Sequence, residues 1–112
     1  MDQKLRALYH SYKHANKKFF DNRLPKGKNI TIVWKKLSKG NYGFARLCED
    51  GSALIGINPE WKKWQEVAIS TLLHEMVHLD LDVRKIPAGQ HGTWFEKGMI
   101  DLANQDAFLG LW

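Results

Sequence analysis

The stretch from Thr71 to Leu79 (TLLHEMVHL) is the part of this chain that most limits its fold. With Val67-Ala68-Ile69 just before it, its apolar residues surround nearly the whole circumference of a helix, so we predict a buried helix over residues 65–81. His74 and His78 stand four residues apart, which places both imidazoles on one face of that helix. Burial of two histidines and a glutamate is costly unless something binds them, and a metal ion would bind them.

Glu75 follows the first histidine and lies about a quarter-turn round the helix, beside the metal position rather than on it. A general base that takes a proton from a metal-activated water must stand there. The pattern His-Glu-x-x-His on a helix is typical of zinc metalloproteases, although it also arises by chance in roughly a few chains per thousand. We therefore predict one zinc ion and a catalytic Glu75, against the alternative of an amphipathic helix with ordinary polar histidines.

His91 is the predicted third zinc ligand, after His74 and His78. Twelve residues separate it from His78, and even after one more helical turn the remaining residues can span up to roughly 30 Å. Three protein ligands leave the fourth tetrahedral position open, as in catalytic zinc sites. Asp80, Asp82 or another acidic residue is the alternative, because some small metalloproteases with this motif take a carboxylate as the third ligand.

Sequence periodicity and turn signals predict an α+β fold. We expect a helix over residues 2–20 with Asp2 as its N-cap, strands over 30–34, 42–48 and 53–58, and a hairpin turn over 49–52. A last helix should begin at Thr93, which has capping-box spacing to Glu96. Short links between the strands predict a three-stranded antiparallel sheet, which with the N-terminal, zinc-binding and C-terminal helices gives a zincin-like arrangement. One strand edge beside the zinc-binding helix should be able to pair with an extended peptide.

The length of 112 residues predicts a single domain over 1–112, and Cys48 as the lone cysteine excludes a disulfide framework or a cysteine zinc site. No apolar run is long enough to span a membrane. The N-terminus shows no signal-peptide core, so we expect a cytoplasmic protein without membrane partners.

Charge is distributed unevenly along the chain. Residues 1–40 hold eleven Lys or Arg side chains and two acidic ones, whereas the other 72 residues hold six basic and ten acidic side chains. A basic N-terminal third suggests contact with a polyanion such as DNA, and the alternative is an ordinary solvated surface.

The segment from Thr71 to His78, followed by His91-Gly92, Phe95 and Met99, resembles the SprT-like (Spartan-type) zinc metalloprotease family. The resemblance extends over nearly the whole chain, through Phe19–Pro25, Trp34, Gly43–Ala45 and Ile57–Pro59. It implies a zinc ion on His74, His78 and His91, a catalytic Glu75, and protein substrates bound or crosslinked to DNA. Many members carry a C-terminal cysteine zinc ribbon, which a chain with one cysteine is expected to lack.

These observations predict a zinc-dependent endopeptidase that acts on DNA-associated proteins. Tyr42 and His10 are candidates for stabilising the oxyanion. Two other functions stay open: a non-catalytic zinc-containing module that binds nucleic acid or protein, and a small metalloprotease that cleaves a dedicated repressor or antitoxin partner.

Overall fold

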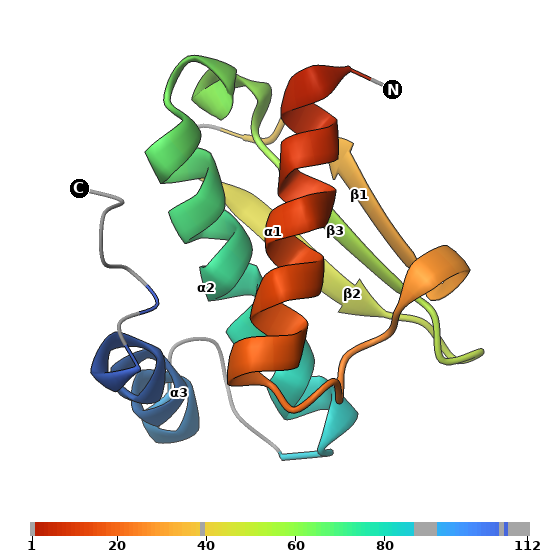
Figure 1. Cartoon of the computed structure of the whole chain (residues 1–112), viewed down its shortest axis with the longest axis vertical. Coiled ribbons are helices and arrows are strands. Elements are labelled where there is room, and N and C mark those ends of the chain that lie inside the picture. The colour runs from red at the N-terminus through yellow and green to blue at the C-terminus, as the bar shows by residue number, and fades with distance from the viewer. Residues whose placement is uncertain (1, 39, 87–91, 106, 108–112) are drawn as a thin grey trace.

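The computed structural model describes residues 2–38, 40–86, 92–105 and 107, and it has an α+β fold (Figure 1). In chain order the elements are α1 (Gln3–Phe19), the 3-10 turn η1 (Gly27–Asn29), β1 (Ile30–Trp34), β2 (Gly43–Leu47), β3 (Ala53–Ile57), the 3-10 helix η2 (Pro59–Lys63), α2 (Gln65–Val83) and α3 (Thr93–Asn104). The predicted helices and strands are therefore present, with ends within a few residues of the predicted ones.

Helix α1 begins as predicted, because the Asp2 carboxylate accepts a hydrogen bond of 2.7 Å from the Leu5 amide. The Tyr9 side chain of α1 is hydrogen-bonded to β1. Its hydroxyl accepts a hydrogen bond of 2.8 Å from the Ile32 amide and donates one of 3.3 Å to the Ile32 carbonyl. The outer edge of β1 is thereby occupied at this point by a side chain of α1.

The sheet has the strand order β1–β3–β2, and the prediction of a purely antiparallel sheet is wrong. β2 and β3 form the expected antiparallel hairpin, but β1 pairs with β3 in parallel. The link over residues 35–42 is long enough to carry the chain past one strand position, so that β3 returns between β1 and β2. Ile55 and Ile57 of β3 are fully buried, and a nearly continuous apolar strand is favoured at the centre of the sheet.

Helices α1 and α2 lie side by side on one face of the sheet, as Figure 1 shows. Between these layers lies the core, whose fully buried members include Leu8, Ile32, Ile55, Leu72 and Met76. Strand β2, at the edge of the sheet, packs more extensively against α2 than the central strand β3 does. This arrangement brings the histidine helix next to an edge strand.

Helix α3 packs against α2 on the side away from the centre of the sheet (Figure 1). It begins at Thr93 as predicted, but the capping box is wrong, since Gly92 is the N-cap and no side chain caps the helix. The two helices approach closely because α3 has glycine at position 98, where an added Cβ would lie 2.7 Å from Val77 Cγ1. Within the described ranges, no helix is long and apolar enough to cross a membrane.

Candidate metal centre

Helix α2 is buried on most of its circumference, in agreement with the apolar residues that surround the predicted site. His74 and His78 are half-buried, whereas Glu75 exposes only 6% of its surface. The two imidazoles thus lie where the buried helix reaches solvent, and the carboxylate lies deeper beside them.

The rings of His74 and His78 lie 5.1 Å apart, measured between their centroids. Two imidazoles that share a tetrahedral zinc ion have centroids roughly 5.2 Å apart, because each ligating nitrogen lies about 2.1 Å from the metal. The spacing of this pair therefore fits two ligands of one zinc ion. Imidazole is also a donor type that zinc prefers.

Phe95 of α3 covers this pair of histidines. Its ring stacks on His78 with 4.3 Å between centroids, and it meets His74 edge-on at 4.7 Å. Phe95 is itself 94% buried, with 6% of its surface exposed, so its position is set by the packing of α3 on α2. The site is thus built from two consecutive helices, α2 and α3.

Glu75 has the properties that a proton acceptor in this position needs. One carboxylate oxygen, Oε2, lies 3.9 Å from His74 Nε2, too far for a hydrogen bond but within reach of a shared water. Burial raises the pKa of the Glu75 carboxyl to about 7. A carboxylate whose pKa lies near neutrality can both accept and return a proton.

Gly43 brings the edge strand β2 against this carboxylate. A Cβ added at Gly43 would lie 2.9 Å from Thr71 Cγ2 and 3.4 Å from Glu75 Cγ, and only 2.8 Å from the Gly56 carbonyl oxygen. Sequence reasoning placed Gly43 in a strand but gave it no role. A glycine inside a strand is the signal that was available, because it often marks the close approach of another element.

The sequence model of the SprT-like family matches residues 8–108 of the chain, which is nearly its whole length. The chain belongs to the SprT-like family. No curated protein matches it. SprT-like chains are usually zinc metalloprotease-like domains, in agreement with the pair of histidines and the glutamate found together on α2.

The third ligand predicted for this SprT-like chain, His91, lies outside the described residues. Among the residues that are described, no group of three or more His, Cys, Asp or Glu side chains is placed to hold a metal ion. His91 precedes Phe95 by four residues, and Phe95 touches both histidines of α2. The assignment of His91 as the third ligand stays a prediction.

Asp80, the first alternative ligand, is engaged elsewhere. Its side chain is buried and accepts hydrogen bonds from Arg23 Nε at 3.0 Å and Arg23 Nη2 at 3.2 Å. Arg84 Nη2 adds an ion pair of 3.0 Å from the next turn of α2. Asp82, the second alternative, is exposed. The carboxylate at position 80 therefore joins the loop after α1 to α2.

The two candidates for stabilising the oxyanion, His10 and Tyr42, lie in different surroundings. His10 is exposed on the outer side of α1. The Tyr42 ring packs on Trp61 at 4.6 Å between centroids.

Proposed function

We propose that this chain is a zinc-dependent endopeptidase of the SprT-like type. The observation that carries the proposal is the position of Glu75, which lies between the histidine pair of α2 and the edge strand β2. A structural zinc site does not need a buried carboxylate with a raised pKa beside its ligands, or an edge strand beside that carboxylate. A peptidase needs both.

His74, His78 and His91 would hold the zinc ion, with the fourth position left for water. When bound, zinc supplies Lewis-acid chemistry: it favours loss of a proton from water and polarises the scissile carbonyl. Glu75 accepts the proton of the attacking water and returns it to the leaving amine. The outer edge of β2 holds the substrate chain extended by backbone hydrogen bonds, so that its scissile bond lies beside Glu75.

The test of this function uses the purified protein and a basic DNA-binding protein as substrate, with Glu75→Gln as the blank. Cleavage by the wild-type chain and none by Glu75→Gln, at equal zinc content, supports the peptidase. Equal cleavage by both removes Glu75 from the mechanism. Zinc binding without any cleavage favours the non-catalytic module, or a protease for one dedicated partner.

The ligand set has its own test in the His91→Ala variant. We expect His91→Ala to lose zinc, because Asp80 is already held by Arg23 and Arg84. Zinc content measured after dialysis decides the matter. Full retention of zinc would show that a carboxylate, and not His91, completes the site.

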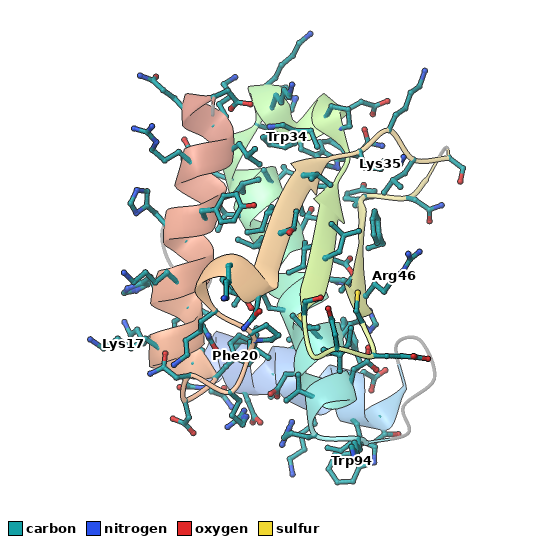
Figure 2. All side chains as sticks on the ribbon, turned by 90° about the vertical axis from the view of Figure 1, so that its right-hand side faces the viewer. Lys17, Phe20, Trp34, Lys35, Arg46 and Trp94 are labelled. Carbon is teal, nitrogen blue, oxygen red and sulfur yellow. The ribbon has the colours of Figure 1, made fainter. Side chains whose placement is uncertain are left out.

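The substrate class we propose is protein associated with DNA, and α1 supplies the observation for it. Its 17 residues contain no acidic side chain, and Lys4, Arg6, Lys13, Lys17 and Lys18 are all exposed. Arg6, His10, Lys13 and Lys17 recur at spacings of four, three and four, so they follow one face of the helix. Figure 2 shows Lys17 pointing outward from α1.

DNA binding of this kind depends on counterion release and weakens steeply as salt rises. Cleavage should therefore be measured with and without single-stranded DNA at low and at physiological salt. Lys13→Glu with Lys17→Glu should remove DNA stimulation and leave cleavage without DNA unchanged. A DNA affinity that does not change with salt would contradict the proposal for α1 and leave the peptidase intact.

A further inference from the structure

Large apolar side chains are exposed at four positions in the described part of the chain: Tyr42, Trp64, Trp94 and Ile100. Two of them flank the 3-10 helix η2, Tyr42 with 54% and Trp64 with 58% of their surface exposed. Trp61 of η2 is partly buried, and its ring packs against the Tyr42 ring with 4.6 Å between centroids. We call Tyr42, Trp61 and Trp64 the aromatic shelf.

The aromatic shelf is held by a continuous series of backbone hydrogen bonds. The Tyr42 carbonyl accepts from the Asn58 amide at 2.8 Å, and the Asn58 carbonyl accepts from the Trp61 amide at 3.1 Å. The Trp61 carbonyl accepts in turn from the Trp64 amide at 3.0 Å, and the Trp64 carbonyl accepts from Ala68 of α2 at 3.0 Å. The three rings are therefore attached to one rigid backbone unit.

Asn58 fixes this unit to the neighbouring loop. It is buried, its side-chain amide donates to the Asn41 carbonyl at 3.2 Å, and its side-chain oxygen accepts from the Glu60 amide at 3.1 Å. The back of the shelf is also supported, because Trp61 packs against the hydrophobic core. Exposed rings on a fixed support lose little side-chain entropy when they bind a ligand.

The aromatic shelf adjoins the candidate active site. Tyr42 directly precedes Gly43, whose Cα faces Thr71 and Glu75 of α2. Trp64 directly precedes Gln65, the first residue of α2, and Thr71 and Glu75 follow roughly two and three turns further along that helix. A polypeptide paired with β2 beside Glu75 would thus continue over the shelf.

We propose that the aromatic shelf is a subsite that binds an aromatic or large aliphatic side chain of the protein substrate. The inference rests on the proposed function, and it adds a specificity to that function. Trp64 precedes Glu75 by eleven residues, which is roughly 16 Å along the helix, and an extended chain advances about 3.3 Å per residue, so the bound side chain lies within roughly five residues of the scissile bond. Stacked aromatic rings with exposed faces bind such side chains through apolar contact and ring packing.

A nucleobase is the other ligand that stacks on aromatic rings, but charge does not favour it here. Residues 60–66 contain two glutamates, Glu60 and Glu66, and two lysines, Lys62 and Lys63, so this segment has no net charge to attract a phosphate chain. The ammonium group of Lys62 lies 5.4 Å from the centroid of the Trp34 ring. The backbone carbonyl of Lys62 accepts a hydrogen bond from Lys4 Nζ. This segment is neutral by itself, with Lys4 of α1 beside it, so it attracts a phosphate chain less strongly than the basic face of α1 does and suits a polypeptide better.

The experiment digests a mixture of quenched decapeptides of random sequence and identifies the cleavage positions by mass spectrometry. Tyr42→Ala and Trp64→Ala are compared with wild type, and Glu75→Gln is the blank. Trp94→Ala is the matched control, because Trp94 is exposed to 49% and lies at the opposite end of the molecule from the Trp34 end of β1 (Figure 2). Folding is checked by circular dichroism and zinc content.

We expect wild type and Trp94→Ala to select Phe, Tyr, Trp or Leu at one position within about five residues of the cut. Tyr42→Ala and Trp64→Ala should lose this selection. On a peptide with the preferred residue, KM should rise about tenfold with little change in kcat, as for lost ground-state binding. A peptide with Ser at that position should show no difference between the variants and wild type.

Three outcomes would overturn the inference. In the first, wild type cleaves without any such selection or the shelf variants keep the selection. This result would show that the shelf does not contact substrate, and the proposed peptidase activity would be unaffected. Variants that weaken binding of an oligothymidine but leave the peptide pattern unchanged would make the shelf a base-stacking surface. Cleavage of no peptide and no protein by wild type would remove the proposed function itself, and the subsite with it.

Discussion

The Phe95 ring stacks on the His78 imidazole, with 4.3 Å between centroids and 23° between the ring planes. The two residues belong to different helices, and the same phenyl ring also touches His74. Helix α3 thus directly contacts the face of α2 that carries the two candidate metal ligands. A side chain that packs on ligands restricts their rotamers before the metal arrives, and such neighbours commonly influence metal affinity.

Replacement of Phe95 by Leu should weaken zinc binding by about tenfold, because both imidazoles gain freedom when the ring is removed. Affinity is measured by competition with a chromophoric chelator. Trp94→Leu on the same helix is the control. It removes an exposed indole ring whose described contact is with Lys97. Equal affinities in wild type and Phe95→Leu would show that the ring only fills the core.

Replacement of Gly43 by Ala should separate β2 from α2. The added Cβ has no space beside Thr71 Cγ2 and the Gly56 carbonyl, so we expect a stability loss of about 1–3 kcal/mol. Because Glu75 lies in the same contact, peptide cleavage should fall roughly 10- to 100-fold while zinc remains bound. Arg46→Ala, at an exposed position of the same strand, is the control. Wild-type activity in Gly43→Ala would mean that β2 can shift without effect on the site.

Replacement of Asp80 by Asn should destabilise the protein without loss of zinc. The buried carboxylate is bonded to Arg23 and Arg84, whose side chains are 35% and 43% exposed, so water screens part of the lost attraction. We expect a decrease of about 2 kcal/mol in the free energy of unfolding, measured by urea denaturation. Asp82→Asn, at an exposed position two residues on, should have no such effect. Zinc loss in Asp80→Asn would return this carboxylate to the ligand set.

The stability of the metal-free protein should depend on pH through Glu75. Burial raises the pKa of its carboxyl from 4.5 to about 7, so between these values the folded state binds the proton that the unfolded state has released. The stabilising contribution of the protonated carboxyl is therefore complete below pH 4.5, is lost as pH rises to 7, and stays lost above it. Its full size is roughly 3 kcal/mol.

Urea denaturation of metal-free wild type and Glu75→Gln between pH 4.5 and 8 measures this effect. Glu75→Gln lacks the titrating group, so its stability relative to wild type should increase towards pH 7 and then level off. Parallel pH profiles would show that the carboxyl of Glu75 is not perturbed in the folded state.

Local signals in the sequence predicted most of the elements. Asp2 was recognisable as an N-cap, the β-branched run over 30–34 as a strand, and the spacing of His74 and His78 as one helix face. Each of these depends on residues within one or two turns of each other, where sequence spacing largely determines geometry. The family likewise follows from motifs that can be read along the chain.

Strand order, the stacking of Phe95 on the histidines and the role of Gly43 were decided only by the tertiary structure. A strand pattern contains no information about which neighbour it joins, so the parallel pairing of β1 with β3 could not be deduced from it. Phe95 and His78 are seventeen positions apart, and Gly43 and Glu75 are thirty-two apart. The sequence by itself determined the chemistry that this chain offers, namely two imidazoles and a carboxylate on one helix. The tertiary structure decided what surrounds that chemistry, because contacts between distant residues depend on how helices and strands pack together and not on their spacing along the chain.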